Sequence, residues 1–146
     1  MNSFTIRGAL VVLALLVVAW LGFGVRGVRL ESDADAVLRQ AQSGPVAPAA
    51  VDAALDDYAK AARLSPDQTP LIRQGQLLWA AARKAEARAV AERATEAEPD
   101  NLQSWFLAWV VADPGTRQKA HAKAEVLKLN PWFLYALTRR SPGSPR

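Results

Sequence analysis

Residues 69–101 read TPLIRQGQLLWAAARKAEARAVAERATEAEPDN, and this stretch contains start and stop signals for two helices. Pro70 suits the first turn of a helix, and Thr69 just before it can cap that helix. Pro99 cannot continue a helix, so it marks the end of the second one. The stretch therefore predicts a helical hairpin.

Small residues recur in this stretch at positions where two packed helices would meet. Gly75 is followed by Ala87 after twelve residues, by Ala94 after seven more and by Pro99 after a further five. This spacing resembles one tetratricopeptide (TPR) repeat, a helix-turn-helix of about 34 residues. The resemblance implies an α-solenoid, in which each hairpin buries its apolar face on its neighbours.

Helical units with similar endings flank this hairpin on both sides. Before it, we expect a helix over residues 50–64 with the small, aromatic and closing residues of a second TPR helix, namely Ala54, Tyr58, Ala61 and Pro66. After it, residues 102–131 repeat the plan with a first helix rich in aromatic residues. The closing prolines, Pro66, Pro99 and Pro131, are 33 and 32 residues apart. Such a period favours about three helix pairs.

The resemblance covers residues 33–137 and departs from the TPR pattern at several positions. Ala82 occupies the turn between the two middle helices, where glycine is common, and Trp109 replaces the usual glycine of the third unit. We expect Trp109 to push its two helices apart or to turn its ring outward. Upstream, we expect Ser32 to cap a separate short helix that ends at residues 43–45.

Residues 8–25, GALVVLALLVVAWLGFGV, contain no charge and no proline. As a helix they would span about 27 Å, against a hydrocarbon core of about 30 Å. We expect an uncleaved, single-pass transmembrane helix. The alternative is a cleaved secretory signal, although the run is long for a signal and no A-x-A site follows it. Arg7 on one side and Arg26 and Arg29 on the other leave the orientation undecided.

The expected chain is all-α and has three parts. Residues 1–29 contain a short tail and the transmembrane anchor, and residues 30–138 form the TPR-like α-solenoid. The segment WFLYAL after Pro131 begins a C-terminal capping helix that covers the last hairpin. Residues 139–146, RRSPGSPR, are too polar and too rich in proline to fold, so we expect a disordered tail.

Composition excludes several classes of site. The chain has no cysteine and one histidine, His121, which stands among lysines without a partner to orient it as a base. The acidic cluster at residues 31–35 lacks the glycine and glutamate of a calcium loop, and we expect the carboxylates at residues 52–57 to form the solvated face of a helix. The basic residues form no concentrated stripe beside aromatics, which argues against nucleic acid. We therefore expect no enzyme activity, cofactor, metal site or small-molecule substrate.

The TPR resemblance implies a protein or peptide partner on the concave face, which TPR proteins line mainly with the first helix of each hairpin. The positions that would point there are Arg39, Ile72, Gln76, Trp79, Gln103, Phe106 and Val110. Chaperone-binding TPR domains use lysine on these helices, and all three first helices lack it. The five tryptophans either fill the seams between hairpins, as burial statistics favour, or serve as binding anchors on this face.

The segments EPDNLQSWFLAW and LKLNP, after an apolar span, are also similar to the helical-repeat tails of some bacterial membrane polymerases and ligases of envelope polysaccharide. We therefore expect a membrane-anchored scaffold in a bacterial envelope assembly, with its repeats on the extracytoplasmic side. The alternative is a structural accessory subunit of a larger membrane enzyme, such as a polysaccharide polymerase or ligase. An enzyme is the third hypothesis, and the polar groups of an active site are missing from the sequence.

Overall fold

The computed structural model describes residues 3–64 and 67–133, together with their side chains except those of residues 3–10, 19 and 21–24. Every regular element in this described part is an α-helix, as expected. The six helices are α1 (Ser3–Ser43), α2 (Pro48–Ala62), α3 (Thr69–Ala80), α4 (Lys84–Ala97), α5 (Leu102–Val111) and α6 (Arg117–Leu129). The expected capping helix beyond residue 133 and the expected disordered tail at residues 139–146 lie outside the described residues.

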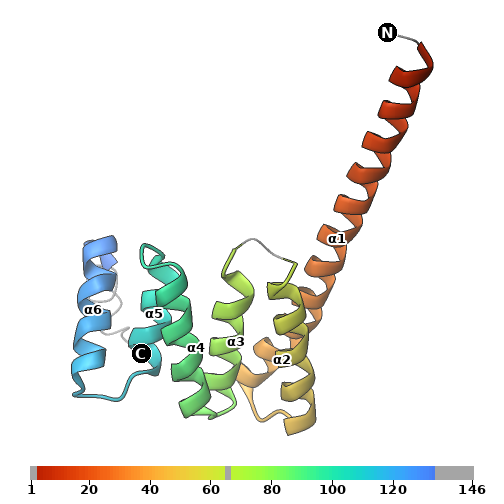
Figure 1. Ribbon diagram of the computed structural model, residues 1–146. Coiled ribbons are helices and arrows are strands. Elements are labelled where there is room, and N and C mark those ends of the chain that lie inside the picture. The colour runs from red at the N-terminus through yellow and green to blue at the C-terminus, as the bar shows by residue number, and fades with distance from the viewer. Residues whose placement is uncertain (1–2, 65–66, 134–146) are drawn as a thin grey trace, which may run out of the picture.

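Consecutive helices pack in pairs, and the pairs follow one another in a row (Figure 1). The pairs are α1 with α2, α3 with α4, and α5 with α6, and each pair also contacts the next one along the chain. The first helix of each pair touches the first helix of its neighbour: α3 contacts both α1 and α5. Over the described residues, α4 contacts neither α2 nor α6 directly through its backbone. The first helices therefore lie closer together than the second ones.

Helix α1 is continuous over 41 residues, about 60 Å at the usual rise. The expected separate helix capped by Ser32 is therefore wrong: Ser32 lies inside α1 and is exposed. The physical reason is that no proline interrupts residues 3–43, so the helix needs no new start. Gly27 is buried, and a Cβ at this position would lie 3.7 Å from the Cβ of Leu64. Packing against the bundle thus begins three residues before the expected domain start at residue 30.

The N-terminal half of α1 projects away from the other helices (Figure 1). Its described side chains are large, apolar and exposed, and they include Val11, Val12, Leu13, Leu15, Leu16, Val17, Val18 and Trp20. Over the described residues, no helix is both long and apolar enough to cross a membrane. Within the expected span at residues 8–25, the side chains of residues 8–10, 19 and 21–24 lie outside the described ones.

Among the described residues, two apolar clusters follow one another along the row of helices. The first joins α1, α2 and α3 through Ala34, Leu38, Val51, Ala54, Tyr58 and Leu77. The second joins α3, α4 and α5 through Ile72, Leu78, Ala87, Val90, Ala91, Ala94, Leu107 and Val111. Ala87 and Ala94 have 0% of their surface exposed, which confirms that the repeat spacing places small residues in the packing.

The turn between α3 and α4 uses Ala82 in a left-handed conformation, with φ of 61°. The backbone N–H of Arg83 donates to the carbonyl oxygen of Leu78 at 2.8 Å, and that of Ala82 donates to the carbonyl oxygen of Trp79 at 3.1 Å. This pair of hydrogen bonds is the Schellman arrangement, which usually places glycine at the left-handed residue. The turn therefore has the geometry of a turn that usually contains glycine, but alanine occupies the glycine position.

The start of α3 differs from the expectation by one residue. Thr69 is the first residue of the helix rather than its cap, and Gln68 precedes it without a side-chain capping bond. Asp67 Oδ1 instead accepts the hydrogen bond of the Thr69 N–H at 2.9 Å. An aspartate two residues before a free N–H can make this local bond in a turn, which removes the need for a threonine cap.

Candidate functional site

A groove of about 300 Å³ lies between α3 and α5, where the first helices of two neighbouring pairs meet. Four of its eight lining residues come from α3 and three from α5, and the last follows α6. They are Thr69, Ile72, Arg73, Gln76, Leu102, Gln103, Phe106 and Phe133. The groove therefore lies on the side of the row that the first helices form.

Three aromatic rings line or border one end of the groove. The Phe106 ring lies 5.5 Å from the Phe133 ring and 5.8 Å from that of Trp109, and each contact is edge-to-face. Trp109 and Phe133 also meet edge-to-face at 5.8 Å. At Trp109, for which we expect separated helices or an outward ring, α5 and α6 are in contact and the side chain is partly buried. Phe133, where the chain returns after α6, supplies the surface against which the tryptophan packs.

Phe106 keeps 37% of its surface exposed despite these contacts. Pairs of aromatic rings at this separation hold each other in a defined orientation. The phenyl ring is therefore positioned on one side and open to the groove on the other, as a contact for a bound apolar group would be.

Arg73 is the one charged residue among those that line the groove. Its Nη1 donates to Gln76 Oε1 at 3.3 Å, and its Nε lies 3.9 Å from Asp35 Oδ1, with the arginine side chain 45% exposed. That ion pair is long, and an exposed pair of this kind contributes little stability. Asp35 Oδ1 also accepts a shorter bond from the Tyr58 hydroxyl, at 2.6 Å. The guanidinium therefore retains hydrogen-bonding capacity toward the groove.

Four of the seven residues expected on the concave face line the groove: Ile72, Gln76, Gln103 and Phe106. Arg39 is exposed on α1, away from it, and Val110 is half-buried on α5 outside the lining. Trp79 packs against the second apolar cluster, and Lys84 Nζ lies 5.7 Å from its ring centroid. Trp79 is at the end of α3 next to the turn, where α4 is close enough to cover its ring.

The expected set omits four lining residues: Thr69, Arg73, Leu102 and Phe133. Three of them had a signal in the sequence. Thr69, Arg73 and Gln76 follow one stripe of a helix, and Leu102 stands four residues before Phe106, which is the spacing of one helix face. Phe133 had none, because its position depends on how the chain turns back after α6.

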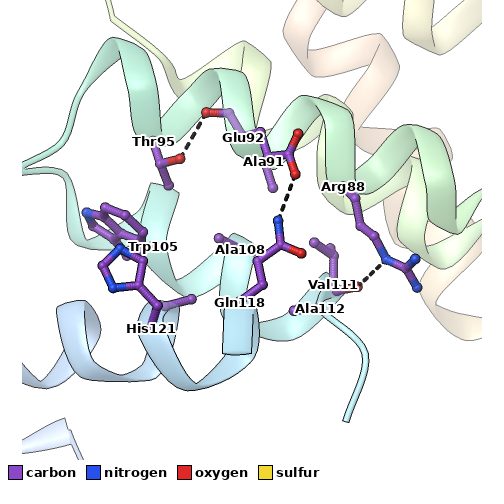
Figure 2. A pocket seen from close by; sticks show the side chains of 11 residues that line it. Arg88, Ala91, Glu92, Thr95, Trp105, Ala108, Val111, Ala112, Gln118 and His121 are labelled. Carbon is purple, nitrogen blue, oxygen red and sulfur yellow. Dashed lines mark hydrogen bonds between the residues drawn. The ribbon is translucent and has the colours of Figure 1, made fainter. Parts of the chain in front are cut away.

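A second hollow, of about 170 Å³, lies among α4, α5 and α6 (Figure 2). Its apolar lining consists largely of alanines, namely Ala91, Ala108, Ala112 and Ala122, together with Val111. At one end, the Trp105 and His121 rings meet edge-to-face at 5.3 Å. Between α6 and α4, Gln118 Nε2 donates to Glu92 Oε1 at 2.7 Å. His121 is exposed, as the sequence suggests, but its ring also closes this cavity.

The acidic cluster at residues 52–57 takes part in ion pairs. Asp52 Oδ1 lies 2.5 Å from Arg83 Nη1, which connects α2 to the turn before α4. Arg83 Nη2 also lies 2.6 Å from Glu86 Oε2, and this hydrogen bonding lowers the pKa of Glu86. Asp56 pairs with Lys60 at 2.6 Å. In the described part of the chain, no three acidic, histidine or cysteine side chains are placed to hold a metal ion.

The groove combines an apolar floor with two amides, a hydroxyl and a guanidinium at its edges. Sites that hold peptides have this composition, because apolar pockets accept side chains while polar groups pair with the main chain. The second hollow, a cavity among α4, α5 and α6, is smaller and more apolar than the groove and lies on the side of the second helices. Comparisons of this chain with protein-family models, with curated proteins and with solved structures find no match.

Proposed function

We propose that this protein is a membrane-anchored scaffold of TPR-like hairpins that binds a protein or peptide in the groove between α3 and α5. The observation that carries the proposal is the exposed phenyl ring of Phe106, which stands among the apolar and amide groups of a preformed groove. Buried aromatic anchors dominate the binding energy of many protein interfaces. The proposal includes no catalysis, cofactor, metal or nucleic acid.

The arrangement of the helices supports the TPR-like α-solenoid. The first helices of successive pairs approach one another closely, whereas the backbone of α4 approaches neither that of α2 nor that of α6. A row of hairpins built in this way curves toward its first helices, which places them on the concave side. The period of the closing prolines, 33 and 32 residues, is close to the length of a TPR unit.

The chemistry of the groove suggests what kind of segment it holds. Ile72, Leu102 and Phe106 offer apolar contact, and the Gln76 and Gln103 amides can both donate to and accept from an extended main chain. Arg73 adds a single positive charge. The preferred partner is thus an extended segment with a large apolar side chain and an acidic group close to it. Apolar contact supplies most of the affinity, and the polar rim sets the register.

The exposed apolar half of α1 supports the membrane anchor over residues 8–25. Side chains such as Leu15, Leu16 and Val18 are more than 60% exposed and belong to the half of α1 that projects from the bundle (Figure 1). Leaving such surface in water costs about 25 cal/mol per Å². A large exposed apolar surface marks a contact with a membrane or a protein. We place the anchor in a bacterial envelope membrane, with the repeats on the extracytoplasmic side.

Substitution of Phe106 by alanine tests the groove. The variant is expected to weaken binding of the partner by about 2 kcal/mol or more, because a central aromatic contact is lost. The partner is captured from membranes of the source cells by a photo-crosslinking residue at position 103, and its retention on each variant is then measured. Lys123→Ala, at an exposed position of α6, is the control and is expected to retain full binding.

Melting of the same variant separates recognition from packing. Phe106→Ala is expected to keep its helix content and nearly all of its melting temperature, since the ring is already 37% exposed. A folded variant that still retains the partner rejects the groove. A large loss of stability shows instead that Phe106 belongs to the core.

A structural accessory subunit of a larger membrane enzyme is the second candidate, and the exposed side chains of α1 are the observation that favours it. In that case, the anchor would pack along a membrane helix of the enzyme, such as a polysaccharide polymerase or ligase. A chain in which an unrelated transmembrane helix replaces residues 1–25 distinguishes the two candidates. The scaffold keeps its partner in detergent, whereas the accessory subunit loses it.

A further inference from the structure

The second helices of the first two pairs carry buried residues at the same spacing. In α2 these residues are Ala54, Tyr58 and Ala61, and in α4 they are Ala87, Ala91 and Ala94. Each residue of the second set follows its counterpart by 33 residues, which is also the separation of Pro66 and Pro99. Ala91 therefore occupies the position that a tyrosine has one unit earlier.

Tyr58 is fully buried, and its ring belongs to the apolar cluster that joins α1, α2 and α3. Its hydroxyl donates to Asp35 Oδ1 at 2.6 Å, so the polar end of the side chain is paired as well. In the first unit, the tyrosine thus supplies both the aromatic volume and the hydrogen bond that the packing of three helices requires.

Where α4 has alanine at this position, the cavity of about 170 Å³ borders the Ala91 methyl group. Ala108 on α5, Ala112 just after it and Ala122 on α6 line the same space. Apolar cavities of about 150 Å³ accept a benzene-sized molecule. The volume therefore suits one aromatic ring, and no described side chain occupies it.

The walls of the cavity suit a ring with one polar substituent. Trp105 and His121 form an aromatic wall, and Trp105 is held in place because its Nε1 donates to the carbonyl oxygen of Pro99 at 2.6 Å. Glu92 stands at the edge of the cavity, where its Oε1 accepts one hydrogen bond from Gln118. A carboxylate has further lone pairs and can accept a second hydrogen bond.

The entrance lies between α4 and α6. The backbones of these helices do not touch, and the hydrogen bond from Gln118 to Glu92 joins exposed side chains across the gap. Such a bond between exposed groups contributes little net stability, so a small molecule can replace it at low cost.

We propose that this cavity binds a single-ring phenol, with the ring among the alanines and the hydroxyl donating to the Glu92 carboxylate. This site is separate from the groove between α3 and α5 and does not depend on a protein partner. Nothing in the sequence indicates a small-molecule ligand here, because alanine in a helix indicates only close packing.

The direct test uses the full chain in detergent, with p-cresol as the probe and toluene as its analogue without a hydroxyl. Alanine methyl groups are followed by NMR as each compound is added. p-Cresol is expected to shift the signals of Ala91, Ala108 and Ala122 saturably, while the exposed Ala53 and Ala89 report only partition into the detergent. Toluene is expected to bind several-fold more weakly. The absence of saturable shifts up to the solubility limit of p-cresol overturns the proposal.

Two matched variants locate the ring. Ala91→Phe is expected to fill the cavity, weaken p-cresol binding at least tenfold and raise the melting temperature. Ala89→Phe makes the same change at an exposed position of the same helix and is expected to preserve binding. If Ala91→Phe does not fold, Ala108→Leu fills the space from α5 with less added volume. Undiminished binding in a folded cavity-filling variant overturns the site.

One further variant tests the hydroxyl. Glu92→Gln keeps the shape of the side chain but replaces the carboxylate, and it is expected to weaken p-cresol several-fold without affecting toluene. Equal affinity of the wild-type protein for p-cresol and toluene, or an unchanged p-cresol affinity in Glu92→Gln, overturns the assignment of a phenol.

Discussion

At the first seam, between α2 and its neighbours, the Tyr58 ring is fully buried and its hydroxyl pairs with Asp35. At the second seam, between α4 and its neighbours, Ala91 occupies the position equivalent to Tyr58, and a cavity of about 170 Å³ lies beside it. The small residues on either side are alanines in both helices, and all of them are buried. The alanines allow the helices to approach closely in both units, but the Tyr58 ring fills space among α1, α2 and α3, whereas the cavity beside Ala91 lies among α4, α5 and α6.

The comparison is tested most strongly by emptying the first seam. Tyr58→Ala removes a fully buried ring and is expected to lower the free energy of unfolding by about 3–5 kcal/mol. Thermal or chemical unfolding measures the loss. Tyr58→Phe is the control that keeps the ring and removes the bond to Asp35, at a cost of about 1–2 kcal/mol. If Tyr58→Ala proves no more costly than Tyr58→Phe, the ring does not hold the first seam together.

A second test asks whether the second seam is tightly packed next to its cavity. A Cβ at Gly75 would lie 2.5 Å from Leu107 Cδ2 and 3.2 Å from Val90 Cγ1. Gly75→Ala is therefore expected to overpack the contact between α3 and α5 and cost about 1–3 kcal/mol of unfolding free energy. Gly44→Ala is the matched control, because nothing lies within 4 Å of its added Cβ. Equal stability of the two variants would mean that Leu107 relaxes into the neighbouring space.

Alkaline pH provides a third test, which acts on the first seam through its buried tyrosine. Burial, with the hydrogen bond to Asp35 as a second cause, raises the pKa of Tyr58 above its ordinary value of 10.0. The unfolded chain therefore loses this proton first, so the stabilisation is fully present below about pH 10 and is lost as the pH rises above it. The expected loss is about 1.4 kcal/mol per pH unit. Chemical unfolding between pH 9 and 11 measures it, and Tyr58→Phe should abolish this part of the slope. An identical slope in both proteins contradicts the assignment to Tyr58.

The smallest expected effects come from the turns that close the second and third pairs. Ala82 has φ of 61° and Gly115 has φ of 78°, so both adopt the left-handed conformation that costs a residue with a Cβ about 1 kcal/mol. Ala82→Gly is expected to raise the melting temperature modestly, and Gly115→Ala is expected to lower it by a similar amount. Changes in melting temperature of opposite sign in the two variants support the cost of the left-handed conformation. A loss of stability in both variants contradicts it, because chain entropy would then outweigh backbone strain.

Prolines and alanines are the residues that make the row of helices predictable. Pro70 and Pro99 act on the backbone next to them, so their effect does not depend on distant residues. Ala87 and Ala94 are buried as their spacing predicts, because helices can approach closely only where side chains are small. Such local signals also placed Gln76, Gln103 and Phe106 on the first helices, and all three line the groove.

The continuity of α1 and the position of Ser32 inside it could not be predicted in this way. A possible cap becomes a cap only if the preceding helix stops, and nothing in residues 3–43 stops it. The contacts of Trp79 were not predictable either, because the turn at Ala82 brings Lys84 of α4 to within 5.7 Å of its ring centroid.

The sequence by itself determined that the described chain is helical, where most of its helices begin and end, and which small residues lie between them. These properties follow from backbone geometry and side-chain size, which each residue brings with it. Only the tertiary structure decided that Phe133 returns to the groove and that a cavity borders Ala91. Both depend on the distances among side chains of three helices, and no single stretch of sequence specifies the space that those side chains leave unfilled.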